Sequence, residues 1–199
     1  MALIVQKYGG SSLANAEAIR NVAQRVTEAI RKEDQIIVVV SAMGDTTNEL
    51  RSLAQDVSGK IDPRELDILL STGELISCTL ISMALQSQGL NAISLSGGQA
   101  GILTDSSYGK ARIASVNPAR ILKELSNGKT VVVAGFQGMT DHMDTTTLGR
   151  GASDLSAVAI AAGVKAEQCE VYTDVDGIYT ADPKIVPRAR ILRELSYEE

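Results

Sequence analysis

Residues 36–40 (IIVVV) are all β-branched and aliphatic, and no polar residue alternates with them. A strand of this composition has to be covered on both faces, which is typical of a parallel sheet with helices on each side. Four more short runs predict further strands, at residues 3–6, 92–95, 131–134 and 169–173. The chain is therefore expected to fold around a mostly parallel sheet.

Helical patterns lie between these runs. Residues 15–32 carry apolar side chains at intervals of three and four, which draws one apolar stripe along a helix. Pro63 suits the first turn of a second helix. Gly73 is expected to interrupt this second helix, which then resumes over residues 76–85.

Two shorter helices and one hairpin complete the pattern. Pro118 opens a helix over residues 119–125, and a second helix, capped by Ser153 or Asp154, runs to Ala162. Residues 101–116 predict a small β-hairpin. Strands that alternate with helices predict a single domain over residues 1–199, with a three-layer α/β/α sandwich around a mostly parallel central sheet.

Charge and composition narrow the classes of partner. The net charge is −5, the two signs are interspersed, and only 3% of residues are aromatic. Without a basic patch or aromatic platforms, nucleic acid is not expected as a partner. Cys78 and Cys169 are interpreted as buried, reduced thiols. No signal peptide and no apolar run of about 20 residues is evident, so we expect a cytoplasmic protein without a membrane partner.

The loop after the first predicted strand has the composition of an anion site. Lys7 and Tyr8 precede Gly9 and Gly10, and Ser11 follows where a helix should begin. Adjacent glycines let backbone N–H groups approach a phosphate, and Lys7 adds a full positive charge. The alternative is a plain turn with a solvated lysine. The order of residues differs from that of a P-loop, and no dinucleotide-binding glycine pattern follows a strand.

Two further segments offer polar groups for a small ligand. Residues 41–48 (SAMGDTTN) supply hydroxyls, among them Ser41 and Thr47, although a helix cap at Thr46 or Thr47 explains part of this pattern. Glu74 follows the Gly73 break and is expected at a helix N-terminus, where it would pair with a cationic ligand group. The alternative for Glu74 is an exposed surface carboxylate.

Arg150 stands between Gly149 and Gly151 and is followed by Ser153 and Asp154. An arginine flanked by glycines can offer its planar guanidinium to a carboxylate. Helix capping is the alternative interpretation of Asp154.

Residues 173–184 (TDVDGIYTADPK) follow the last predicted strand and suit a purine and ribose site. Thr173 and Asp174 begin this segment, Tyr179 would lie against the base, and Lys184 would reach a phosphate. Asp174 and Asp176 could together hold Mg²⁺, but an Asx turn is the simpler role for Asp176. The only histidine, His142, is interpreted as a surface residue, so histidine-dependent nucleophilic catalysis has no support.

Taken together, these segments resemble the aspartate kinase branch of the amino acid kinase family. The matching segments occur in family order: VQKYGGSS (5–12), VSAMG (40–44), STGE (71–74), AGFQG (134–138), TLGRG (147–151) and YTDVDGIYTADP (172–183). There are two departures from the family pattern. Tyr8 and Ser12 replace the common Phe and Thr, and Ala152 stands where a third glycine is usual.

The resemblance implies a kinase that uses ATP and Mg²⁺ to phosphorylate the side-chain carboxylate of L-aspartate. In that interpretation Arg150 binds the α-carboxylate of aspartate and Glu74 its ammonium. Further aspartate-binding residues would be Ser41, Thr47, Gly151, Ser153 and Asp154. Lys7 and Asp154 would be catalytic, with Lys7 neutralising the transferring phosphoryl group. The nucleotide would contact Lys7, Tyr8, Gly9, Gly10, Ser11, Ser41, Thr173, Asp174, Tyr179 and Lys184.

Several alternatives stay open at this point. Acetylglutamate, glutamate and uridylate kinases share the fold, a non-catalytic nucleotide-sensing or amino-acid-sensing module would keep it without turnover, and a dehydrogenase domain is a third class. Ser196 and Glu199 form a capping box, which indicates that a helix is starting. We therefore expect a catalytic domain that is incomplete at its C-terminus and lacks regulatory modules. The complete protein is expected to be a homo-oligomer or to have a regulatory partner.

Overall fold

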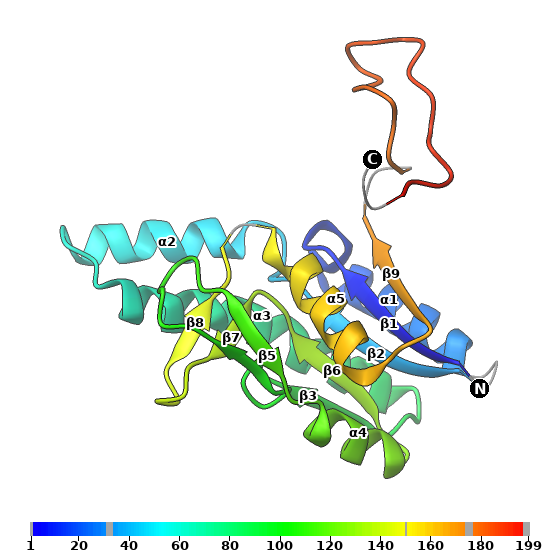
Figure 1. Ribbon diagram of the computed structural model, residues 1–199, viewed down its shortest axis with the longest axis horizontal. Helices are drawn as coiled ribbons and strands as arrows, with labels where there is room; N and C mark the ends of the chain where they lie inside the picture. Colours follow the sequence, from blue (N-terminus) through cyan, green and yellow to red (C-terminus); the bar gives the residue numbers. More distant parts are fainter. Residues whose placement is uncertain (1, 31–33, 150, 174–176, 197–199) are drawn as a thin grey trace.

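The computed structural model describes residues 2–30, 34–149, 151–173 and 177–196. Its larger sheet has five parallel strands in the order β3-β6-β2-β1-β9 (Figure 1). The bounds of these strands are β1 Leu3–Tyr8, β2 Gln35–Val40, β3 Ala92–Leu95, β6 Thr130–Ala134 and β9 Gln168–Tyr172. Every pairing in this sheet is parallel, and Tyr8 lies opposite both Val40 and Tyr172. All five strands predicted from the sequence are present.

Both faces of the central strand β2 are buried, as its composition requires. Val38 and Val40 belong to a core cluster formed with α1 (Ala16–Ile30) and α3 (Pro63–Ser87). Ile37 and Val39 belong to a second cluster on the other face, formed with α4 (Ala119–Ser126) and α5 (Ala152–Val164). The three-layer α/β/α prediction is therefore confirmed.

A second, smaller sheet lies beside the first, in the order β5-β4-β7-β8. Strands β4 (Ile102–Thr104) and β5 (Ile113–Val116) form the predicted antiparallel hairpin. Strands β7 (Gln137–Met139) and β8 (Thr145–Thr147) were not predicted, because each has only three residues and neither is rich in apolar side chains. This sheet forms the second wall of the cavity described below.

The predicted break in α3 is wrong, because the helix runs without interruption through Gly73. Asp62 caps its N-terminus by accepting hydrogen bonds from the N–H groups of Arg64 and Glu65, and Pro63 is the first helical residue. A Cβ on Gly73 would lie 3.0 Å from the Cβ of Ala42. Gly73 therefore allows α3 to approach the loop after β2.

The helix α2 (Thr46–Val57) packs on α3 and follows that loop directly. Asp45 occupies its N-cap position, so neither Thr46 nor Thr47 is the cap. At α5 the N-cap is Gly151 and no side chain caps the helix, so the predicted cap at Ser153 or Asp154 is also wrong.

Two features, one on the surface and one in the core, differ from the sequence interpretation. Cys78 is a buried free thiol, but Cys169 is exposed on the edge strand β9. Among the described helices, α3 alone is long and apolar enough to cross a membrane by length and composition, and half of the relevant window is buried within the fold. It packs between the sheet and α2 as a core helix does.

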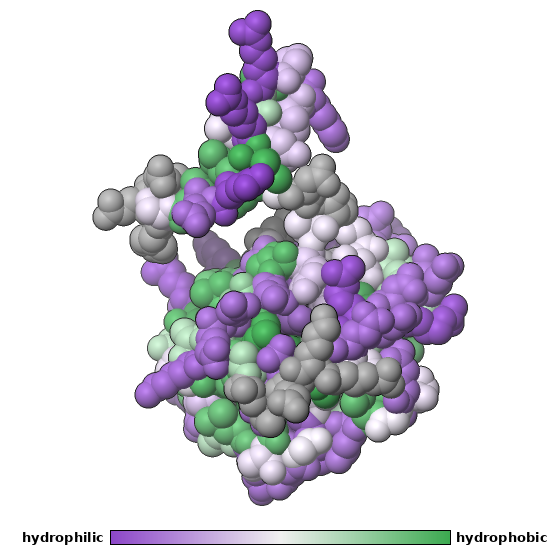
Figure 2. Space-filling model, turned by 90° about the vertical axis from the view of Figure 1, so that its right-hand side faces the viewer, coloured by the Kyte–Doolittle hydropathy of each residue, from purple (hydrophilic) through white to green (hydrophobic). Residues whose placement is uncertain are grey.

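Residues 177–196 form an irregular segment after β9, held by a bridge between Tyr179 and Ile191. Figure 1 and Figure 2 show this segment extending away from the layers of the sandwich, at the end of the sheet where β9 lies.

Candidate active site

A cavity of about 320 Å³ opens at the carboxyl ends of β1 and β2, between the α2–α3 pair and the second sheet. Ligands in parallel α/β sheets bind at this end of the strands. Its lining includes eight of the predicted site residues: Lys7, Gly10, Ser41, Thr47, Glu74, Gly151, Ser153 and Asp154. Segments far apart in the sequence thus meet at one place.

Lys7 and Asp154 form an ion pair at this cavity. Lys7 lies near the end of β1, and its Nζ atom is 2.6 Å from Oδ1 of Asp154. The lysine side chain is 11% exposed and the aspartate side chain 52% exposed. Asp154 stands in the first turn of α5, where no side-chain hydrogen bond caps the helix, and its carboxylate pairs with the lysine instead. The pair places a buried ammonium at the cavity wall.

The glycine loop after β1 is held against the loop after β2. The N–H of Gly44 donates to the carbonyl oxygen of Gly10 over 3.1 Å. A Cβ on Gly10 would lie 2.7 Å from the carbonyl oxygen of Ala42, whereas a Cβ on Gly9 would meet nothing closer than Lys7 Nζ at 3.6 Å. The two glycines of the motif therefore have different roles, and only Gly10 is required for close packing.

We expect Gly10→Ala to destabilise the fold by about 1–3 kcal/mol, because two backbone segments must separate to admit the methyl group. The matched variant Gly9→Ala should change stability by less than about 0.5 kcal/mol. Urea denaturation of both variants measures the difference. Equal stability of the two variants would contradict this packing role.

Glu74 is the most unusual group in the cavity. It is 3% exposed, Oε1 accepts a hydrogen bond from the N–H of Ala42 over 3.0 Å, and Oε2 has no hydrogen-bond partner among the described residues. Burial raises the pKa of this carboxyl to about 7, although the Ala42 N–H opposes the shift. An ionised buried carboxylate with one free oxygen is a site for a cation.

The sequence interpretation of Glu74 needs one correction. Because α3 is continuous, Glu74 lies in the middle of a helix and not at a helix N-terminus. The helix dipole therefore does not favour its charge. What makes the site suitable for a cation is the unpaired oxygen beside the Ala42 loop, which the sequence does not reveal.

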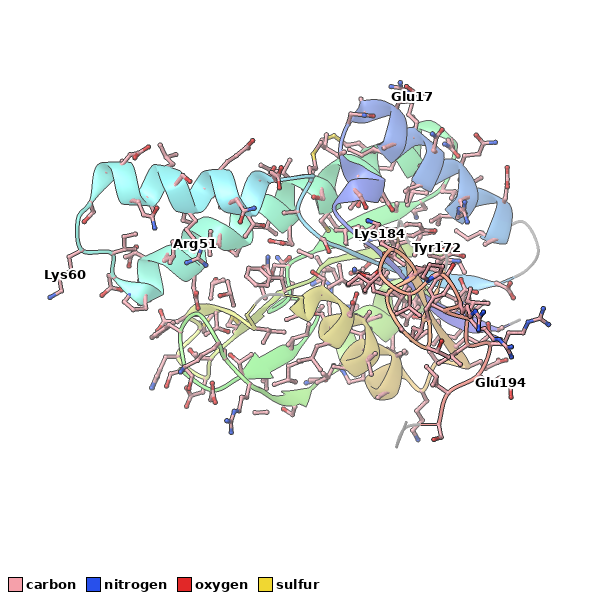
Figure 3. All side chains as sticks on the ribbon, turned by 90° about the horizontal axis from the view of Figure 1, so that it is seen from above. Glu17, Arg51, Lys60, Tyr172, Lys184 and Glu194 are labelled. Atoms are coloured by element: carbon pink, nitrogen blue, oxygen red, sulfur yellow. The ribbon has the colours of Figure 1, made fainter. Side chains whose placement is uncertain are left out.

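Eight further residues line the cavity and were not predicted as site residues: Ala42, Gly44, Asn48, Arg51, Gly109, Phe136, Thr147 and Gly149. Arg51 is four residues after Thr47 on α2, and Figure 3 shows its side chain leaving the helix toward the second sheet. A helical interpretation of residues 46–57 would have placed both side chains on one face. Arg51 is thus a second cation of the cavity lining.

The residues predicted to bind the nucleotide lie less close together than the residues predicted to bind aspartate. The side chain of Tyr8 is buried on the opposite face of β1, where its ring stacks on Tyr172 with centroids 4.7 Å apart and its hydroxyl donates to Gln6. Burial raises the pKa of Tyr8. Only the backbone of Tyr8 therefore remains available to a ligand in the cavity.

The other predicted nucleotide residues that the structure describes lie outside this cavity. Ser11 is exposed in a short 3-10 helix, Ser11–Leu13. Thr173 follows β9, Lys184 is exposed, and Tyr179 takes part in the bridge of the C-terminal segment. Arg150 and Asp174, together with Asp176, lie outside the described residues. His142 is exposed, in agreement with its surface interpretation.

The sequence profile of the amino acid kinase family matches residues 2–199. The chain belongs to the amino acid kinase family. It is 55% identical over 200 residues to the aspartokinase of Mycolicibacterium smegmatis, covering all of this chain and 48% of that protein. The aspartokinase of Corynebacterium glutamicum is 54% identical with the same coverage. The chain thus spans about half the length of the curated relatives it matches.

Solved structures of the family have the same fold. Aspartate kinase from Synechocystis superposes with a TM-score of 0.81 at 49% identity, covering 95% of this chain and 31% of that one. Aspartokinase III of E. coli, in complex with aspartate and ADP, superposes with a TM-score of 0.83 at 26% identity, covering 96% of this chain and 53% of that one. An isopentenyl phosphate kinase, at 21% identity and a TM-score of 0.62, shares the fold alone.

Proposed function

We propose that this chain is the catalytic core of an aspartate kinase, which transfers the γ-phosphoryl group of ATP to the side-chain carboxylate of L-aspartate and forms 4-phospho-L-aspartate. The observation that carries the proposal is the cavity itself. It combines a buried carboxylate with a free oxygen, Glu74, and a buried lysine, Lys7. The proposal is supported by relatives that are named aspartokinase and align with the whole of this chain.

In this proposal aspartate is bound by charge complementarity. The ammonium group would pair with Oε2 of Glu74, and the α-carboxylate would be bound by the guanidinium of Arg150. Ser41, Thr47, Ser153 and the backbone of Gly151 would supply further hydrogen bonds. N-acetylglutamate has no cationic amine to compensate the buried charge of Glu74, so this residue favours a free amino acid over that alternative.

The phosphoryl group would be neutralised from the β1 side of the cavity. Lys7 would contact the transferring group, with the N–H groups of the loop after β1 beside it, and Asp154 would hold the lysine in place through the 2.6 Å ion pair. The acceptor carboxylate is already ionised at neutral pH, so no strong general base is needed. Catalysis would consist of positioning and charge stabilisation.

ATP would carry Mg²⁺ into the site. No group of three or more acidic, histidine or cysteine side chains among the described residues is arranged to hold a metal ion. Mg²⁺ in kinases is held largely by substrate phosphates and water, with one or two carboxylates, and the half-exposed Asp154 suits such a role. Thr173, Asp174, Tyr179 and Lys184 would frame the base, ribose and phosphates.

The wider setting follows from the same proposal. Phosphorylation of aspartate would be the first step towards lysine, threonine and methionine, in the cytoplasm. We propose that the complete protein is a homo-oligomer or has a regulatory partner.

Arg150→Lys is expected to weaken aspartate binding by about 1–3 kcal/mol, because an ammonium group cannot make the two parallel hydrogen bonds of a guanidinium. Isothermal titration calorimetry with aspartate measures this loss. Unchanged affinity would remove Arg150 from the site.

The proposed specificity is tested by calorimetry with two ligands. L-Aspartate should bind and N-acetyl-L-aspartate should not, because acetylation removes the positive charge that Glu74 requires. Equal binding of both compounds, or binding of neither, would contradict the proposed acceptor site.

A further inference from the structure

Asp67 is a fully buried carboxylate of α3 for which the proposed reaction has no use. Both of its oxygens accept a hydrogen bond from the N–H of Gly109, at 3.0 and 2.9 Å. Oδ2 also accepts from the N–H of Thr147 over 2.8 Å, and Oδ1 accepts from its hydroxyl over 2.7 Å. One side chain therefore holds two separate segments of the second sheet.

Both segments that Asp67 holds belong to the cavity wall. Gly109 and Thr147 line the cavity, on the side of the second sheet. The carbonyl oxygen of Thr147 in turn accepts a hydrogen bond from Ala111 over 2.9 Å, so the two segments are also tied to each other. Thr147 is the last residue of β8 and begins the segment 147–151, which leads to α5.

The same helix carries the proposed ammonium site. Glu74 lies seven residues after Asp67, two turns along α3, and both side chains are buried. The helix thus presents two carboxylates along one face. Asp67 accepts hydrogen bonds from the second sheet with both of its oxygens, whereas Glu74 keeps one oxygen without a hydrogen-bond partner in the described part of the cavity.

We propose that Asp67 is a positioning residue for the amino acid acceptor: it fixes the distance between Glu74 on α3 and the Gly109 and Thr147 wall opposite. This inference rests on the proposed function. It assigns the hydrogen bonds of Asp67 to acceptor binding, because they go to Gly109 and Thr147 on the wall formed by the second sheet, whereas the proposed phosphate site lies on β1 and the glycine loop. Loss of Asp67 should therefore affect the acceptor and spare the nucleotide.

Two substitutions separate the effect of the Asp67 hydrogen bonds from the effect of its negative charge. In Asp67→Asn, the amide oxygen can take the place of Oδ2 and accept from the N–H groups of Gly109 and Thr147. The amide nitrogen then occupies the place of Oδ1 and donates to the Thr147 hydroxyl, which can reverse its role. Asp67→Ala loses every one of these bonds. The asparagine variant should consequently rescue what the alanine variant loses.

The experiment measures steady-state kinetics with aspartate and with ATP, in the complete natural protein. Asp67→Ala should raise the KM for aspartate at least about tenfold and leave the KM for ATP within about twofold, and Asp67→Asn should recover most of the aspartate affinity. Asp56→Ala, an exposed aspartate of α2, is the matched control. Thr147→Val keeps a β-branched side chain and removes only the hydrogen bond from the Thr147 hydroxyl to Asp67. It should raise the KM for aspartate about threefold, and it tests the inference even if Asp67→Ala does not fold.

Three outcomes would overturn the inference: equal loss for both substrates in Asp67→Ala, an unchanged KM for aspartate in both Asp67→Ala and Thr147→Val, or an asparagine variant as impaired as the alanine variant. Failure of the unmodified protein to phosphorylate aspartate is a different result. It would remove the proposed function, and the acceptor role of Asp67 with it.

Discussion

Glu74→Gln should stabilise the protein above neutral pH and at the same time abolish aspartate binding. The folded protein raises the pKa of Glu74 from 4.5 to about 7, so the folded state favours the protonated carboxyl. Protonation of Glu74 contributes fully to the free energy of unfolding below pH 4.5, the pKa of this carboxyl in the unfolded chain. This contribution is lost as the pH rises from 4.5 to about 7, the pKa in the folded protein. The loss amounts to up to about 3 kcal/mol, from the difference between the two pKa values.

The glutamine variant cannot ionise and avoids this loss. We expect it to exceed the unmodified protein in stability by about 1 kcal/mol at pH 5.5 and by about 3 kcal/mol at pH 8. Urea denaturation at the two pH values measures the difference, and Glu49→Gln, an exposed position on α2, is the control. A stability difference that does not grow with pH would show that Glu74 is not a strained carboxylate in the free protein.

The same variant should give no binding heat with aspartate at pH 8, because no negative charge remains to pair with the ammonium. Opposite effects on stability and binding are characteristic of a binding group whose charge is destabilising until the ligand arrives. Full aspartate affinity in Glu74→Gln would contradict the assignment of the ammonium site.

Lys7→Ala should lower kcat by about 10²–10³-fold and raise the KM for aspartate only slightly. The reason is that the charge of Lys7 is most valuable when the phosphoryl group is between donor and acceptor. Lys123→Ala, an exposed lysine on α4, is the control for general effects of charge removal. A similar loss in both kinetic parameters, or no loss, would argue against a role in the transition state.

Much of the fold could be predicted because its strongest signals are local. The run Ile37-Val38-Val39 has no polar face, and the structure buries both of its sides in separate clusters. The short strands β7 and β8 escaped prediction because three residues are too few for a periodic pattern. Gly73 was misinterpreted because a glycine that breaks a helix and one that admits a neighbouring loop look the same in sequence.

The candidate site could be predicted where a segment follows a strand, and could not where it depends on packing. Lys7 lies near the carboxyl end of β1 and Asp154 lies in the first turn of α5, the next helix after β8, and the structure brings their side chains to 2.6 Å. Arg51 and Asp67 lie within helices, where a charged residue is usually a solvated one. Their positions at the cavity and under its wall follow from the packing of α2 and α3 on other elements, which no local pattern contains.

Formation of a hydroxamate tests the central claim most directly, because hydroxylamine traps an acyl phosphate as it forms. The complete natural protein would be incubated with ATP, Mg²⁺ and hydroxylamine, and with L-aspartate, L-glutamate, N-acetyl-L-glutamate or no acceptor. The account predicts ATP-dependent hydroxamate with L-aspartate alone, and its loss in Glu74→Gln. Hydroxamate from N-acetyl-L-glutamate, or ATP binding without any hydroxamate from aspartate, would contradict it.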